Sequence, residues 1–176
     1  MPKGLGTMTT SRSKGNSLSV EIRHDIQPGD IGYIIYLHGK LYAEEYGFDH
    51  TFEPYVAGPM AEFVKSQTVK DRLWIVEKDE QIMGSVAIVK SSEQEAQLRW
   101  LILHPEIRGR GLGKMLVEGA VKFSKESEYE SIFLWTLDIL PSALWVYKSA
   151  GFQLTEKKKH RIWGRLLTEE RYDLKL

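Results

Sequence analysis

The chain has 176 residues, of which 42% are hydrophobic and 27% charged, and its 24 lysines and arginines balance 24 aspartates and glutamates. This length and composition are typical of one globular domain, and the balanced charge gives no general attraction to nucleic acid or to an anionic membrane. The sequence has no cysteine, which excludes disulfides, thiolate metal sites and a cysteine nucleophile.

The N-terminal residues 1–17 are polar and basic and contain no apolar run of the kind found in signal peptides. We expect them to form a flexible tail, with residues 18–176 forming the domain. No window approaches the roughly 18 consecutive apolar residues of a membrane-spanning helix. The sequence therefore predicts a cytoplasmic protein with neither a membrane nor a nucleic acid as its partner.

The first part of the domain predicts one strand followed by two helices. The strand is expected at Leu18–His24. Asp30 is expected to cap a helix whose apolar residues recur at helical spacing, and Gly47 to end it. A second helix is predicted to begin near Pro54, a residue suited to a first turn, and to kink or divide into two pieces at Pro59.

The rest of the chain alternates strands and helices, which predicts a mixed α/β domain. Strand-like runs lie at 72–78, 81–91, 96–105, 131–139, 152–163 and 169–176. Within the third run, Trp100 to Leu103 are consecutively apolar, so we expect burial on both faces. An amphipathic helix follows this run and buries a stripe from Leu112 to Phe123. A second, short helix begins near Ser142 and ends at Gly151.

Glycines alternate at Gly109, Gly111 and Gly113 within the basic stretch RGRGLGK, residues 108–114, just before the amphipathic helix. Glycine costs about 1 kcal/mol against alanine where a helix forms, and a phosphate held by backbone N–H groups would offset that cost. The P-loop pattern fails because Met115 stands where a hydroxyl must bind magnesium. The dinucleotide fingerprint fails as well, because its third glycine would fall on a lysine.

Two motifs resemble the GCN5-related N-acetyltransferase (GNAT) family. The run from Arg108 to Gly113 fits [Q/R]-x-x-G-x-[G/A], the family's coenzyme A pyrophosphate loop. A downstream strand and short helix carry A-x-x-x-Y-x-x-x-G-F, the family's second motif, on Ala143, Tyr147, Gly151 and Phe152. Stretches such as QLRWLILHPEIRGRGLG look like the acetyltransferase domains fused behind MarR-type regulators, although the sequence shows no such DNA-binding domain.

The resemblance covers residues 18–176 and implies an α/β GNAT fold in a single domain. Its mixed, mostly antiparallel sheet would have about seven strands with about four helices, splayed between strands four and five. The implied cofactor is acetyl-CoA, whose pantetheine arm would pair with the backbone of strand four. The implied cofactor contacts are Leu101, Ile102, Leu103, Arg108, Gly109, Arg110, Gly111, Leu112, Gly113, Lys114, Asp138, Ala143 and Tyr147. The basic side chains among them fit solvated surface charge equally well.

The resemblance implies direct attack of an amine on the thioester, with Tyr147 as general acid. A phenol with an ordinary pKa near 10 is protonated at neutral pH and can donate. The alternative is a core tyrosine that packs on Ala143 and Ala150. Many members of the family carry a glutamate near the start of strand four that acts as the general base. At the matching position this chain has Gln97, which cannot accept a proton at neutral pH. Glu95 is the substitute that could act through water, unless it only ends a strand.

Other residues bear on the amine acceptor. Glu44, Glu45 and Glu53 surround the join of the first two helices and are candidates to bind or deprotonate an amine, or are simply solvated. Aromatic residues in the same region form an acceptor wall or pack the two helices together: Tyr42, Tyr46, Phe48, Phe52 and Tyr55. The histidines lack metal-ligand spacing, so no metal is expected. The basic run 156–161, EKKKHR, is expected to be a solvated part of a hairpin.

The sequence thus predicts an acetyl-CoA-dependent N-acetyltransferase that acts on a primary amine of a small molecule, a protein N-terminus or a lysine. Leu140 replaces an asparagine that the family often carries, and Leu137 another that close relatives favour, so the polar contacts of those side chains are lost or replaced. Gln97 and Leu140 leave an alternative, a non-catalytic acyl-CoA-binding sensor or interaction protein. Dimerisation is common for the fold, and the sequence leaves a homodimer open.

Overall fold

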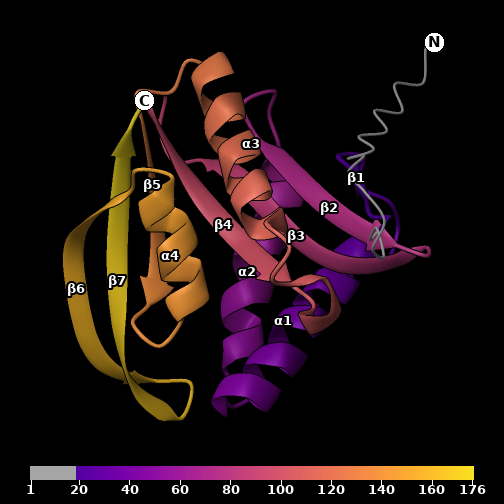
Figure 1. The fold of residues 1–176 in the computed structure, drawn as a ribbon, viewed down its shortest axis with the longest axis vertical. Coiled ribbons are helices and arrows are strands. Elements are labelled where there is room, and N and C mark those ends of the chain that lie inside the picture. Colours follow the sequence, from indigo (N-terminus) through magenta and orange to yellow (C-terminus); the bar gives the residue numbers. More distant parts are fainter. Residues whose placement is uncertain (1–18) are drawn as a thin grey trace.

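A computed structural model describes residues 19–176 as one seven-stranded sheet covered by helices on both faces (Figure 1). The predicted tail, residues 1–17, and Leu18 lie outside the described residues. The elements in chain order are β1 Glu21–Arg23, α1 Asp30–Tyr46, α2 Phe52–Ser66, β2 Arg72–Lys78, β3 Gln81–Lys90, β4 Glu95–Leu103, a 3-10 turn Pro105–Ile107, α3 Leu112–Glu126, β5 Ser131–Leu137, α4 Pro141–Ser149, β6 Gln153–Ile162 and β7 Arg165–Lys175.

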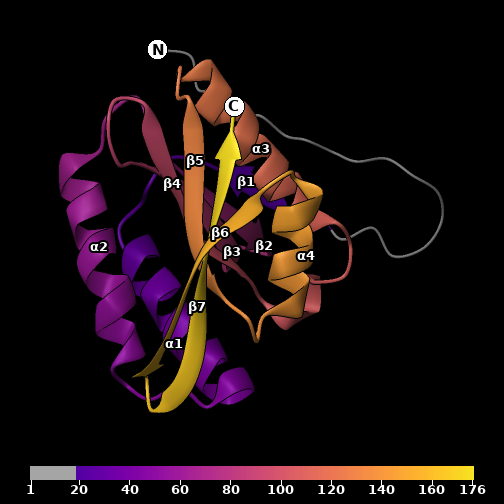
Figure 2. The same cartoon turned by 90° about the vertical axis from the view of Figure 1, so that its left-hand side faces the viewer.

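The strands follow the order β1-β2-β3-β4-β5-β7-β6, with every neighbouring pair antiparallel except β4 and β5. Helices α1 and α2 cover one face of the sheet and α3 and α4 the other (Figure 2), so two apolar layers form, one on each side. This arrangement confirms the expected α/β domain with a mixed, mostly antiparallel sheet of seven strands and four α-helices within the described residues. The basic run 156–161 lies on the exposed edge strand β6, where lysines discourage pairing with another sheet edge.

Two details of the first helices differ from the sequence predictions. Gly29, at φ 99°, caps α1, and Asp30 is the first helical residue rather than the cap. Its carboxylate accepts hydrogen bonds from the Arg23 guanidinium at 2.7 and 2.8 Å, which ties α1 to β1. Helix α2 is one continuous helix through Pro59, not two pieces, because its apolar face packs along its whole length on the sheet. Gly47, at φ 68°, ends α1 as predicted.

Strand β4 contains a β-bulge that divides its side chains between the two faces. Ser85 pairs with Ile102 and Ala87 with Arg99, so Trp100 and Leu101 together oppose one residue of β3. Trp100 adopts a left-handed conformation, φ 53°, and its carbonyl accepts a hydrogen bond from the buried Ser85 hydroxyl at 2.8 Å. The predicted burial of Trp100 to Leu103 on both faces is confirmed in part: Trp100 and Ile102 are buried on the side of α1 and α2, while Leu101 and Leu103 are half-buried against the layer that contains α3.

The sheet opens between β4 and β5, as the resemblance implies. These two strands pair only over Glu95–Gln97 and Ser131–Phe133. Beyond that point β4 continues beside β3 and β5 beside β7, so the edge of β4 that faces β5 is unpaired from Leu98 to Leu103. The two strands form a V whose wide end faces the glycine stretch before α3.

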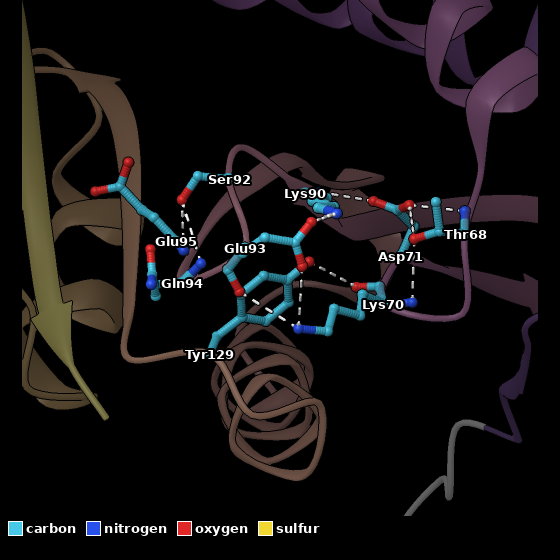
Figure 3. A network of polar contacts seen from close by, with 9 residues as sticks. All are labelled: Thr68, Lys70, Asp71, Lys90, Ser92, Glu93, Gln94, Glu95 and Tyr129. Carbon is cyan, nitrogen blue, oxygen red and sulfur yellow. Dashed lines mark hydrogen bonds and ion pairs between the residues drawn. The ribbon is translucent and has the colours of Figure 1, made fainter.

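A polar network holds the closed end of this V (Figure 3). The Asp71 carboxylate accepts hydrogen bonds from the backbone N–H groups of Thr68 at 2.8 Å and Lys90 at 2.6 Å, and the Tyr129 hydroxyl donates to the Lys70 carbonyl at 3.2 Å. The network joins the loop before β2, the end of β3 and the loop before β5. Since these loops cannot separate, the sheet opens at the other end of β4.

Candidate active site

A cavity of about 110 Å³ lies where β4 and β5 separate. Aromatic side chains of α1 and α2 form one wall, β4 and β5 form the floor, and α4 and β7 close the sides. The lining residues are His38, Tyr42, Phe52, Tyr55, Val56, Gln97, Leu98, Arg99, Trp100, Leu101, Trp135, Thr136, Leu137, Leu140, Ala143, Tyr147, Trp163 and Glu169. The cavity is mostly apolar with a few polar groups, which is the usual character of a small-molecule site.

The glycine stretch forms a tight turn at the N-terminus of α3. Gly109 has φ 75° and Gly111 has φ 78°, a region that side chains other than glycine rarely adopt. Gly111 caps the helix, so the N–H groups of residues 112–114 have no partner within α3 and carry the positive end of its dipole. A Cβ at either glycine would meet no protein atom within 4 Å. The turn therefore presents backbone donors beside open space.

The basic side chains of this turn have different partners. The Arg108 guanidinium forms two 2.8 Å hydrogen bonds with the Glu45 carboxylate, and its Nε donates to the Leu103 carbonyl at 2.7 Å. Arg108 thus clamps the end of β4 to α1. Arg110 is exposed, and Lys114 lies 3.7 Å from Glu118 on the surface of α3. All three side chains are exposed, and Arg108 is the one held by short hydrogen bonds to α1 and to the end of β4.

The second sequence motif comes together around Tyr147. This tyrosine is buried on α4, lines the cavity with Ala143, and packs edge-on against Phe152 at 6.1 Å between ring centroids. Gly151, at φ 96°, makes the turn that brings Phe152 back to it. Burial raises the pKa of Tyr147, so its hydroxyl remains protonated at neutral pH. Asp138 is exposed and does not line the cavity.

None of the acidic residues selected from the sequence lines the cavity. Glu95 lies at the closed end of the V, where its carboxylate accepts a hydrogen bond from Arg171 at 3.1 Å. Glu45 is held by Arg108, while Glu44 and Glu53 are exposed. Sequence position alone suggested these residues, but strand pairing and long-range ion pairs direct their side chains elsewhere.

Three polar residues that sequence reasoning passed over do line the cavity. The Glu169 carboxylate of β7 lies 2.6 Å from Nε2 of His160, and Arg99 projects from β4. His38 of α1 is fully buried, with Nδ1 2.8 Å from the Ile34 carbonyl, and burial lowers its pKa to about 4. Glu169 is the first residue of the predicted strand 169–176, and no local signal indicated that its face of β7 would border the cavity.

Comparison with known proteins places this geometry in a family. The model of the Acetyltransferase (GNAT) family matches residues 38–152, more than half of the chain. The chain belongs to this family. The matched GNAT region runs from α1 to the end of the second motif, so it contains both the glycine turn and Tyr147.

Individual relatives agree with the family assignment. N-acetyltransferase 8B of Homo sapiens is 31% identical over 99 residues, covering 53% of this chain and 44% of the human protein, so the chain spans less than half of that relative. An uncharacterized N-acetyltransferase of Schizosaccharomyces pombe is 33% identical over 122 residues, covering 68% of this chain and 74% of the yeast protein. No helix within residues 19–176 is long and apolar enough to cross a membrane.

A solved structure shows the same GNAT fold. The acetyltransferase yncA of Salmonella typhimurium, determined with acetyl-CoA, superimposes with a TM-score of 0.71 over 89% of this chain and 93% of the other, at 14% identity. At that identity the likeness concerns the fold alone.

Proposed function

We propose that this GNAT protein is an acetyl-CoA-dependent N-acetyltransferase that acetylates a primary amine. The observation that carries the proposal is the position of the glycine turn at the wide end of the V, next to the unpaired edge of β4 and the Tyr147 cavity. Backbone N–H groups that can bind an anion, a free strand edge and a buried proton donor follow one another along the V. This is the order in which the pyrophosphate, the pantetheine arm and the thioester of an acyl-CoA follow one another. The names of the human and yeast relatives, and the acetyl-CoA in the Salmonella structure, support it.

The residues of the chain would divide the work along the V. The backbone N–H groups of Leu112, Gly113 and Lys114 would bind the pyrophosphate, since a helix N-terminus favours negative charge. The unpaired edge of β4 at Leu101–Leu103 would pair with the pantetheine arm, although the Leu103 carbonyl already accepts a hydrogen bond from Arg108. Acetyl-CoA supplies the activated acetyl thioester.

The cavity would then serve the amine. The neutral amine attacks the acetyl carbonyl carbon, and as the carbon–sulfur bond breaks the Tyr147 hydroxyl would donate its proton to the leaving thiolate. The proton that the new amide nitrogen loses would then return to Tyr147, directly or through water. Glu169 is the sole carboxylate that lines the cavity within the described residues, and it would accept the proton of the incoming ammonium, directly or through water. Gln97, which also lines the cavity, has no proton-accepting role at neutral pH.

Calorimetric titration with acetyl-CoA tests the proposal, with free CoA and an adenosine nucleotide without pantetheine as comparisons. We expect binding that requires the pantetheine arm, followed by CoA release when amines are added. Gly111→Glu is expected to abolish binding, because it places a carboxylate and a strained backbone where the phosphates would lie. Gly119→Glu is the matched control, since Gly119 is helical and a Cβ there meets nothing within 4 Å.

The outcomes separate the alternatives. Wild-type affinity in the Gly111→Glu variant would refute the pyrophosphate assignment. Binding of acetyl-CoA without turnover on any amine would favour the non-catalytic acyl-CoA sensor instead. Absence of binding would mean that the glycines only shape a turn.

A further inference from the structure

Arg99 stands in the cavity because side chains alternate along β4, so that Arg99 lies on the same side of the strand as Gln97, which also lines the cavity. Leu98 packs toward α3, whereas Arg99 and Trp100 both lie on the side of α1 and α2, because the extra residue interrupts the alternation. The Arg99 guanidinium is 5.1 Å from the Trp100 ring centroid and donates to the Gln97 amide oxygen at 3.3 Å. Its charge therefore faces the acceptor side of the cavity rather than the solvent.

Within residues 19–176, this cation has no carboxylate partner. Residues 1–18 contain no aspartate or glutamate, so they cannot supply one. Arg171, on the same face of the sheet, shows the contrast: its guanidinium contacts Asp173 at 2.7 Å and Glu95 at 3.1 Å. Half-buried charges are usually paired, since an unpaired charge loses hydration without compensation.

The pKa values of Arg99 and its neighbour Tyr55 reflect the burial of the Arg99 charge. Burial lowers the pKa of Arg99; the Tyr55 phenol opposes the effect, and no carboxylate within residues 19–176 does. Burial raises the pKa of Tyr55, the positive charge of Arg99 lowers it, and the negative charge of Glu169 raises it. Both charges therefore lie close enough to act on the Tyr55 hydroxyl. The cavity thus presents one cation and one anion near the same aromatic wall.

We infer that the acceptor amine carries a carboxylate that Arg99 binds, which makes the substrate class amino acids and related aminocarboxylates. The inference rests on the proposed function and specifies its acceptor. A guanidinium binds a carboxylate with two parallel hydrogen bonds, and Arg99, which has no carboxylate partner within residues 19–176, can offer them. Glu169 provides the opposite charge for the ammonium of the same zwitterion. A purely cationic amine would instead bring its charge beside the guanidinium and be repelled.

Phenylalanine and 2-phenylethylamine test the inference, because they differ only by the carboxylate and suit the aromatic wall. CoA release with acetyl-CoA is expected to be faster with phenylalanine. Arg99→Gln is expected to raise the KM for phenylalanine about tenfold or more, while the KM for 2-phenylethylamine does not rise, because its ammonium loses a repelling neighbour. Arg99→Lys is expected to recover part of the loss. Arg161→Gln, which removes an exposed arginine of β6, is the matched control.

A binding assay without turnover accompanies the kinetics. N-acetylphenylalanine and N-acetyl-2-phenylethylamine are titrated in the presence of CoA, and fluorescence of Trp135 and Trp163, which line the cavity, reports binding. Preference for the acetylated amino acid, lost in Arg99→Gln, supports the inference. Equal binding of the two compounds, or an unchanged Arg99→Gln variant, overturns it while the proposed function stands. Failure of the wild type to bind acetyl-CoA in calorimetry overturns the proposed function, and this inference with it.

Discussion

Tyr147 is the residue on which the proposed chemistry most directly depends, because its buried hydroxyl is the protonated phenol of the second family motif. Tyr147→Phe keeps the ring and its packing on Phe152 but removes the donor. We expect turnover to fall about 100-fold while acetyl-CoA affinity is nearly unchanged, as for loss of a general acid. Steady-state kinetics and calorimetry measure the two effects separately.

The matched control is Tyr36→Phe, which removes the hydroxyl of an exposed tyrosine on α1. It is expected to leave both quantities unchanged. If Tyr147→Phe turned over at the wild-type rate, another group would have to protonate the thiolate.

His38 connects the cavity to the pH dependence of stability. Burial lowers its pKa from 6.5 to about 4, so between these values the unfolded chain binds a proton that the folded chain does not. The free energy of unfolding therefore falls as the pH decreases from about 6.5 to 4, and His38 contributes about 3 kcal/mol to this fall. Urea denaturation of wild type and His38→Leu across this range is expected to show a flatter dependence in the variant.

The exposed His50 supplies the comparison for this experiment. His50→Leu is expected to keep the slope of the wild type. Identical slopes in wild type and His38→Leu would show that the buried histidine does not titrate in this way.

At the scale of elements, the approach of β3 to β4 shapes the proposed cofactor edge. A Cβ at Gly84 would lie 2.5 Å from the Ile102 carbonyl oxygen and 2.7 Å from Cδ2 of Leu103. Gly84→Ala must therefore push the wide end of β4 away from β3. We expect a loss of about 2 kcal/mol in the free energy of unfolding, together with weaker acetyl-CoA binding, measured by urea denaturation and calorimetry.

The matched substitution is Gly32→Ala on α1, where a Cβ meets nothing within 4 Å. Because alanine favours helix, this variant is expected to gain about 0.5–1 kcal/mol and to bind acetyl-CoA as the wild type does. Equal stability of Gly84→Ala and wild type would contradict the close approach of the two strands.

At the scale of the whole molecule, the two apolar layers that the structure describes are built from residues 20–176. The domain boundary predicted from the sequence, residues 18–176, can therefore be tested by removing residues 1–17. A chain that consists of residues 18–176 is expected to melt within about 2 °C of the full chain, a small fraction of a domain's stability, and to bind acetyl-CoA equally well. A larger drop in Tm, or lost affinity, would assign residues 1–17 a structural or binding role.

The sequence by itself determined the order of the elements, because apolar periodicity and turn residues are local signals. It located the glycine turn and the Tyr147 motif for the same reason: Gly109, Gly111 and Gly151 occupy backbone conformations that few other residues accept. Local signals misled where a neighbour far away in the sequence decides. Asp30 was expected to cap a helix, yet its carboxylate pairs with Arg23 of β1.

Only the tertiary structure decided which charges face the cavity. Arg108 and Glu45 are 63 positions apart, and Arg171 and Glu95 are 76 positions apart, so no local pattern reveals that these pairs hold Glu45 and Glu95 away from the site. The bulge at Trp100, whose carbonyl accepts a hydrogen bond from Ser85 of the neighbouring strand, brings Trp100 to the same side of β4 as Arg99. Charge pairing and strand register depend on distances in space, which the order of residues along the chain does not contain.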